Sequence, residues 1–200
     1  MANISAVTFL ESDVPLYCEM ARNGSVVVVD TETTGFADTD DIVQLAVLLY
    51  RRGQEIFGKS VYLRNQIPID GTEAQQVNHI TDALLAEKGL EPKVVLEDFL
   101  ALLDQEIAES GKVCLVAHNL AFDWRMIANM LEKHGCRGLP KRVAPCCTRE
   151  FVKALRLPKT FLPSHRLKDC ISALGLEGAN SHDALDDARA CAALFRLLTE

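Results

Sequence analysis

The chain has 200 residues, of which 48% are hydrophobic, and it carries a formal net charge of −7 at pH 7. This length and composition fit one globular domain with a substantial core. No apolar run is long enough to cross a membrane, and the polar start lacks the pattern of a secretory signal, so we expect a cytoplasmic protein without membrane contact. The seven cysteines are scattered without a C-x-x-C pair, which argues against a disulfide framework and a zinc site.

The predicted secondary structure alternates between strands and helices. In chain order we expect a short helix at 14–22, strands at 26–29, 42–50 and 60–64, a helix at 94–109, a strand at 112–117, and helices at 120–134 and 183–198. The turn at 51–54 indicates an antiparallel pairing of the second and third strands. Residues 135–168 are irregular, with short elements at most. Strand followed at once by helix is typical of an α/β domain.

Basic residues are concentrated in one segment. Nine lysines and arginines and a single acid, Glu150, lie between residues 137 and 168, so this segment carries +8 and the rest of the chain −15. The net charge argues against a nucleic-acid partner, whereas this distribution indicates a surface that tracks a phosphate backbone. The alternative is a solvated basic face on short helices.

Two carboxylates lie at the end of the first strand, in the sequence VVVVDTETTG. Because side chains alternate along a strand, Asp30 and Glu32 point to the same face and Thr31 points away. Like charges this close raise each other's pKa unless a cation lies between them, and hard divalent cations prefer oxygen ligands. The alternative is a strand that runs into an ordinary polar turn.

Two further acids fall on apolar helix faces. Asp123 shares the buried face of the helix at 120–134, and Asp187 faces the core from the final helix, whereas Asp186 faces solvent. Asp183 is borderline and fits a role at the helix start, which is also the alternative for Asp123. An unpaired buried charge is costly, and a metal ion would supply the partner. His182, in the loop before the final helix, lies close enough in sequence to act near these carboxylates.

Three ordered motifs carry a family resemblance: D-x-E-T-T-G at Asp30 to Gly35, H-N-x-x-F-D at His118 to Asp123, and H-x-A-x-x-D-A at His182 to Ala188. The chain resembles the DEDDh-type 3′→5′ exonuclease family, which includes the proofreading epsilon subunit of bacterial DNA polymerase III. The resemblance spans about residues 25–198. It implies a ribonuclease H-like α/β fold, with a mixed five-stranded sheet flanked by helices, in which 1–24 are a helical N-terminal extension and 25–200 the exonuclease domain.

The resemblance also implies the roles of the site residues. Asp30, Glu32, Asp123 and Asp187 would bind two divalent ions, Mg2+ or Mn2+, and His182 would be the general base. The residues expected to line the pocket for the 3′-terminal nucleotide are Thr33, Thr34, Gly35, Phe36, His79, His118, Asn119 and Phe122.

The chain departs from the family pattern at one place. Many relatives carry V-H-G-I-T after the third strand, whereas this chain has Val77-Asn78-His79-Ile80-Thr81. The histidine is displaced by one position, which leaves its contact with the nucleotide open, and Thr81 is expected to cap the next helix. The chain also ends with the helix of the third motif, without the long tail that tethers the epsilon subunit, which favours a freestanding enzyme.

The expected function is a metal-dependent 3′→5′ exonuclease that releases nucleoside monophosphates from the 3′ end of single-stranded or frayed DNA. One alternative is an RNA-trimming exoribonuclease, because the contact to the 2′-OH is invisible in sequence. A second is a proofreading or binding subunit that partners a DNA polymerase. A third is an unrelated α/β domain whose acids only cap helices.

Overall fold

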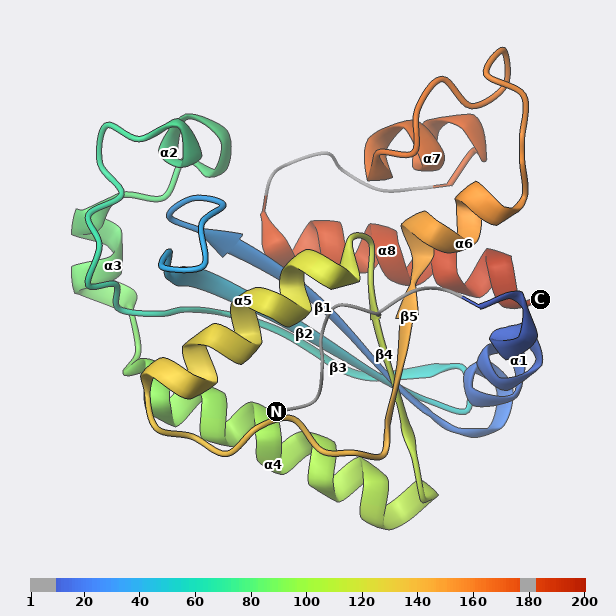
Figure 1. Ribbon diagram of the computed structural model, residues 1–200, viewed down its shortest axis with the longest axis horizontal. Coiled ribbons are helices and arrows are strands. Elements are labelled where there is room, and N and C mark those ends of the chain that lie inside the picture. The colour runs from blue at the N-terminus through green and yellow to red at the C-terminus, as the bar shows by residue number, and fades with distance from the viewer. Residues whose placement is uncertain (1–9, 177–182) are drawn as a thin grey trace.

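A mixed five-stranded sheet forms the centre of the protein in the computed structural model, which describes residues 10–176 and 183–200 (Figure 1). The strands lie in the order β3-β2-β1-β4-β5, with β2 and β3 antiparallel to their neighbours and β1, β4 and β5 parallel. Their bounds are β1 Ser25–Thr33, β2 Ile42–Arg51, β3 Gln54–Tyr62, β4 Val113–Ala117 and β5 Val143–Cys147. This is the sheet that the sequence predicts.

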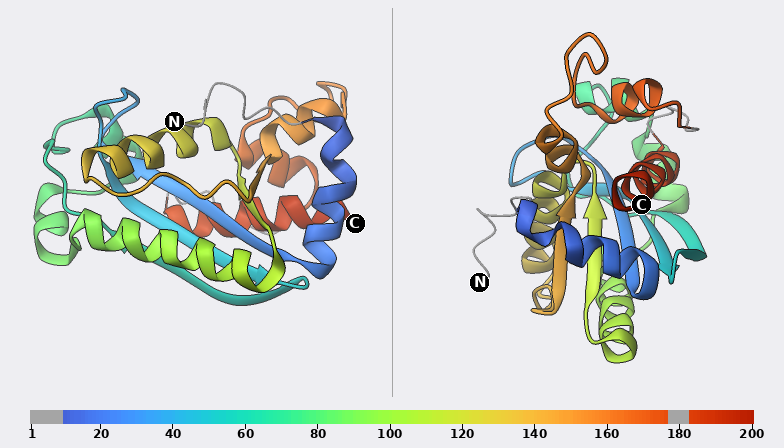
Figure 2. Two further views of the ribbon diagram at one scale, coloured as in Figure 1. Left: turned by 60° about the horizontal axis from the view of Figure 1, so that its bottom comes forward. Right: turned by 90° about the vertical axis from the view of Figure 1, so that its right-hand side faces the viewer.

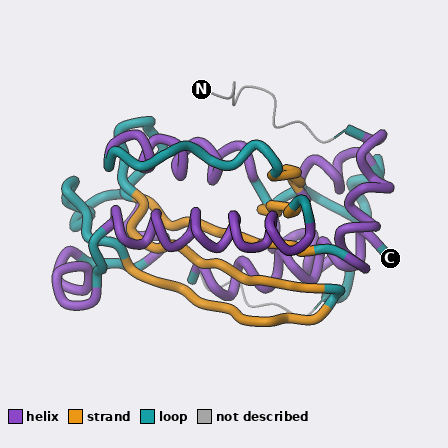
Figure 3. The backbone as a smooth tube through the Cα atoms, turned by 90° about the horizontal axis from the view of Figure 1, so that it is seen from below, coloured by secondary structure: helices purple, strands orange, loops and turns teal. Residues whose placement is uncertain are grey.

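Helices cover both faces of the sheet. Their bounds are α1 Val14–Asn23, after a short 3-10 turn at Glu11–Asp13, α2 Glu73–Asn78, α3 Asp82–Lys88, α4 Pro92–Ser110, α5 Leu120–Lys133, α6 Thr148–Ala154, α7 Leu167–Ala173 and α8 Ala184–Thr199. The end-on view in Figure 2 places α5 and α8 on opposite sides of the sheet. Figure 3 shows α4 running alongside the strands. No helix of the described residues is long and apolar enough to span a membrane.

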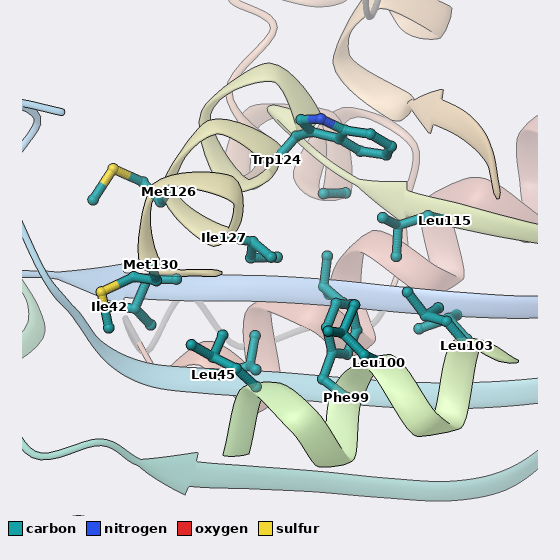
Figure 4. Packing of buried hydrophobic residues seen from close by; sticks show 14 of the residues in the cluster. Ile42, Leu45, Phe99, Leu100, Leu103, Leu115, Trp124, Met126, Ile127 and Met130 are labelled. Atoms are coloured by element: carbon teal, nitrogen blue, oxygen red, sulfur yellow. The ribbon is translucent and has the colours of Figure 1, made fainter. Parts of the chain in front are cut away.

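The valine run of β1 is continuous because both of its faces are covered. Val27 and Val29 join a core cluster with α4 and α5, whereas Val26 and Val28 join a second cluster with α1 and α8. Figure 4 shows the first cluster, in which side chains of α4 and α5 meet over the strands. Each fully buried aliphatic side chain of this kind stabilises the fold by about 1.5–3 kcal/mol. The two-sided core therefore holds the end of β1 rigidly in the middle of the molecule.

Small residues bring α8 close to the sheet. Ala184, Ala188 and Cys191 are buried on the helix face that packs against β1 and β2. On β3, a Cβ atom at Gly58 would lie 2.4 Å from Leu48 Cδ2 of β2 and in ordinary contact, 3.7 Å, with Leu185 Cδ1 of α8, so a larger residue there would displace the Leu48 side chain. Close approach matters for function because the first turn of α8 carries acidic residues.

The third strand is longer at its start than predicted. It begins at Gln54, not at residue 60, and it ends at Tyr62. Arg52 and Gly53 both have positive φ values, 51° and 74°, which is the geometry of a two-residue hairpin turn, so the ladder resumes at once with Arg51 opposite Gln54. The first half of β3 is exposed at the sheet edge and lacks an apolar alternation. The predicted antiparallel pairing is confirmed.

Candidate metal centre and active site

Three acidic side chains from two elements converge at the carboxyl end of β1. One carboxylate oxygen each from Asp30, Glu32 and Asp187 lies within 4.8 Å of the others. Asp30 and Glu32 project from the same face of β1 as Val26 and Val28, and this is the face that α8 covers. The structure thus brings Asp187 to the two strand residues, as the helical periodicity predicts.

The fourth acid, Asp123, approaches from the other layer of the fold. It sits in the first turn of α5, is 4% exposed and accepts a hydrogen bond of 2.8 Å from Thr31 Oγ1. Its charge nevertheless raises the pKa of Asp30, second only to the effect of burial. Asp123 therefore lies beside the other three acids without joining their compact group. Thr31 points away from Asp30, as predicted, and this orientation lets it hold Asp123.

Burial and mutual repulsion make the carboxylates reluctant to ionise. Burial and then the neighbouring Asp187 raise the pKa of Glu32 to about 8, although a hydrogen bond from Asn78 opposes the shift. Burial and the charge of Asp123 raise the pKa of Asp30 well above its usual value, and burial raises that of Asp123 to about 6. A hard divalent cation takes carboxylate oxygens at about 2.0–2.6 Å, so oxygens this close together suit such an ion. The donor set therefore fits Mg2+ or Mn2+.

Gln44 is a site residue that the sequence does not reveal. It lies opposite Glu32 in the β1–β2 register. Its Nε2 donates to Ser60 Oγ at 2.8 Å and to Asp183 Oδ2 at 3.1 Å, and its Oε1 accepts from the backbone of Ala184 at 3.4 Å. Gln44 thereby anchors the start of α8, one turn before Asp187. Its only signal in the sequence is a polar residue within the apolar run IVQLAVLLY.

Asp183 caps α8, as the sequence suggests. Its side chain accepts a hydrogen bond of 3.0 Å from the backbone of Leu185. Asp186 forms an ion pair with Arg189 at 3.8 Å, and both side chains are exposed. His182, the predicted general base, lies outside the described residues, and its role stays a prediction.

The segment that departs from the family pattern presents an amide to the site. Asn78 is 7% exposed, its Nδ2 donates to the carbonyl of Thr33 at 3.3 Å, and it hydrogen-bonds to Glu32. His79 is exposed at the end of α2, with a φ of 58°. This left-handed conformation explains why glycine suits the position in relatives. A contact of His79 with substrate stays a prediction. Thr81 caps α3, as expected, by accepting from Leu84 N at 3.1 Å.

His118 is held by both ring nitrogens. Its Nε2 lies 2.9 Å from the carbonyl oxygen of His165, and its Nδ1 lies 3.0 Å from Thr148 Oγ1. A carbonyl only accepts, so Nε2 carries the proton and Nδ1 accepts from the threonine. Burial lowers the pKa of His118 to about 4, which keeps the ring neutral. His118 therefore ties β4 to the segment after α6, and a contact with substrate stays a prediction.

The turn after β1 is stiffened by Asp40. Thr34 Oγ1 donates to Asp40 Oδ1 at 3.1 Å and accepts from Asp41 N at 3.0 Å, while Thr33 Oγ1 donates to the carbonyl of Gly35 at 2.6 Å. A Cβ atom at Gly35 would lie 2.5 Å from Asp40 Oδ2, so only glycine fits there. The predicted pocket residues of this turn are therefore fixed in position.

An aromatic pair lies beside this turn. Phe36 is 78% exposed, whereas Phe122 is half-buried against the core. The two rings lie 5.9 Å apart, and Arg125 stacks over Phe122 at 5.6 Å. Arg125 also donates to the carbonyl of Phe36 at 3.0 Å. Asn119, the residue before α5, accepts from Arg149 at 3.4 Å. An exposed aromatic platform of this kind suits the stacking of a nucleobase.

The RNase_T family, described as exonuclease, matches residues 27–195 of the chain. The chain belongs to this exonuclease family. The matched range contains all four acids of the candidate site. The mixed sheet flanked by helices is the ribonuclease H-like fold that the three motifs imply.

Individual relatives of the chain include DNA polymerase III proteins. The chain is 29% identical to a PolC-type DNA polymerase III of Thermotoga petrophila over 187 residues, which cover 92% of the chain and 12% of that protein. It is 31% identical to a DNA polymerase III subunit epsilon of Treponema pallidum over 169 residues, or 83% and 72% of the two chains. Among solved structures it is similar to E. coli exonuclease I in complex with a dT13 oligonucleotide, with a TM-score of 0.74 and 20% identity, over 88% of the chain and 41% of exonuclease I.

Proposed function

We propose that this chain is a metal-dependent 3′→5′ exonuclease that hydrolyses phosphodiester bonds at the 3′ end of single-stranded or frayed DNA and releases nucleoside monophosphates. The observation that carries the proposal is the set of three carboxylate oxygens within 4.8 Å at the end of β1. Burial and repulsion make this set unfavourable without a cation, and membership of the exonuclease family supplies a reaction that uses one.

The four carboxylates would hold two divalent ions, Mg2+ or Mn2+. The compact part of the site consists of Asp30, Glu32 and Asp187. Asp123 lies beside it, held by the hydrogen bond from Thr31. Divalent ions bound there would activate a water molecule and stabilise the charge that develops on the phosphate and the leaving oxygen. His182 would accept the proton of the attacking water, because an imidazole titrates near neutral pH.

The remaining site residues would place the 3′-terminal nucleotide. The exposed Phe36 and the half-buried Phe122 offer rings for its base, next to the stiff turn of Thr33, Thr34 and Gly35. Binding is sequence-tolerant if it depends on stacking, since every base has an aromatic face. An exonuclease that works inward from any 3′ end needs this tolerance.

DNA is the favoured substrate over RNA. The epsilon and PolC-type relatives are named as DNA polymerase III proteins, and the exonuclease I structure contains a DNA oligonucleotide. RNA is the alternative, because a single hydrogen bond to the 2′-OH decides between the two. A DNA polymerase is a candidate partner on the same grounds, and gel filtration of the chain with a polymerase would test it.

Digestion of a labelled oligonucleotide tests the proposal. A 20-nucleotide strand labelled at its 5′ end, as DNA and as RNA, is incubated with Mg2+, with Mn2+ and with chelator. We expect a ladder that shortens from the 3′ end, requires the metal and proceeds faster on DNA. Asp187→Asn, prepared in parallel, controls for contaminating nucleases. Activity that persists in chelator, or equally in the variant, would contradict the metal mechanism, and faster digestion of the RNA strand would reverse the substrate preference.

A further inference from the structure

A basic cavity lies between α6 and the segment that leads to α7. It has a volume of about 540 Å³. Its lining includes Arg149, Lys153, Arg156, Lys159 and Arg166, together with His165 and with aliphatic and small polar residues, and no acid is among the described lining residues. Figure 1 shows this part of the chain in orange, above α8. Five cations around one cavity repel each other, so the arrangement suits an anionic ligand.

Most of the cavity's cations form no ion pair with another residue of the described part of the chain. Lys153 pairs with Glu150 at 2.6 Å, whereas the other four form no ion pair within residues 10–176 and 183–200. The Nε atom of Arg149 is buried and lacks a hydrogen-bond partner in the same described part of the chain. A buried donor without an acceptor is costly, and an anion in the cavity would supply the acceptor.

The cavity wall is a fixed structure. Leu162 is 2% exposed and packs with Val152 and Cys170 in a separate core cluster, which anchors the connection between α6 and α7. Arg156 has a φ of 50° at the end of α6. A long side chain rarely adopts this left-handed conformation, and strain of this kind is typical of binding sites.

Two hydrogen bonds join the cavity to the candidate active site. Arg149 donates to Asn119 Oδ1 at 3.4 Å, and Asn119 directly precedes α5, whose first turn carries Asp123. The carbonyl of His165, another lining residue, accepts from His118 Nε2 at 2.9 Å. A strand whose 3′ end occupies the carboxylate site therefore has a basic cavity beside it.

We propose that this cavity binds a backbone phosphate of the substrate strand at a nucleotide upstream of the scissile bond. The inference rests on the proposed function, because it assumes a nucleic-acid substrate. Phe, Tyr and Trp are absent from the described lining and five cations are present, so the cavity offers mainly charge, which suits a phosphate. Binding here is independent of sequence and requires a substrate of several nucleotides.

Binding of a fluorescent dT12 oligonucleotide to the full chain in chelator tests the cavity without turnover. Arg156→Gly removes a cation and suits the left-handed backbone, so its melting temperature should not fall, and Lys159→Gln removes a second charge from the same wall. For the double variant we expect the Kd to rise about tenfold and the slope of log Kd against log salt to shrink by about 0.7, the value for the loss of one phosphate contact on a single strand. Lys112→Gln, an exposed residue outside both the cavity and the basic segment 137–168, is the matched control and should leave both unchanged.

The outcomes separate the cavity from the proposed function. An unchanged Kd and salt slope in the double variant would overturn the inference, even if the wild-type chain digests DNA from the 3′ end. Absence of hydrolysis by the wild-type chain, with tight binding that depends on the cavity, would instead contradict the proposed function alone. Competition with dTMP distinguishes the source of the phosphate. If the double substitution weakens dTMP binding and leaves dT12 binding intact, the cavity takes a free nucleotide and the inference is wrong.

Discussion

Replacing Glu32 by glutamine should stabilise the metal-free protein while it abolishes activity. The amide keeps the shape of the side chain and an acceptor for Asn78, and it removes one of the crowded charges. A pKa near 8 in place of 4.5 corresponds, at about 1.4 kcal/mol per pH unit, to about 5 kcal/mol against the folded state once Glu32 is ionised. Water screens part of this energy because Glu32 is only half-buried, so we expect Glu32→Gln to raise the free energy of unfolding by about 2 kcal/mol.

The stability difference between Glu32→Gln and the wild type should grow as the pH rises. Because the folded state holds the proton of Glu32 more tightly than the unfolded chain, the free energy of unfolding falls as the pH rises from about 4.5 to about 8. The glutamine of Glu32→Gln does not titrate, so the variant keeps its free energy of unfolding over this range. Its gain in stability over the wild type should therefore be small at pH 5 and full at pH 9.

Thermal unfolding in chelator measures this difference. At about 2–4 °C per kcal/mol for a domain of this size, the variant should melt about 4–8 °C above the wild type at pH 9. Glu87→Gln, an exposed residue of α3, is the control and should change stability by less than about 0.5 kcal/mol. Saturating Mg2+ should reverse the order, because only the wild type binds it well. Equal melting temperatures of the variant and the wild type at pH 9 in chelator would refute the inference that the buried carboxylates destabilise the metal-free protein.

Four further substitutions, one of them a control, test individual residues of the site. Asp187→Asn should lower kcat by at least about 10²-fold because a metal ligand is lost. Asp186→Asn is the control, and its kcat should stay within about twofold of the wild type because the Asp186 side chain pairs with Arg189. Equal losses of kcat in the two variants would mean that the final helix is misplaced. His182→Ala should lower kcat by about 10²–10⁴-fold with an unchanged circular dichroism spectrum, and full activity would exclude it as the general base. Gln44→Leu should cost about 1–3 kcal/mol of stability and raise the Mg2+ concentration for half-maximal rate, and an unchanged metal requirement would confine Gln44 to a structural role.

Local patterns in the sequence were sufficient for most of the elements. Alternation along β1 put Asp30 and Glu32 on one face, and helical periodicity separated Asp187 from Asp186. These inferences succeed because a side chain's direction within one strand or helix depends only on its spacing. The short helices α2 and α3 and the early start of β3 lacked such a pattern, since exposed elements carry little apolar periodicity.

What the sequence by itself determined is the identity of the four acids, the strand and helices that carry them, and the family. Only the tertiary structure decided how these acids are held. Gln44 reaches Asp183 across 139 residues of sequence, and His118 reaches His165 across 47. The tertiary structure likewise turned Asn78 inward and His79 outward, through a backbone that passes into the left-handed region. Such contacts depend on packing between distant segments, which no local spacing encodes.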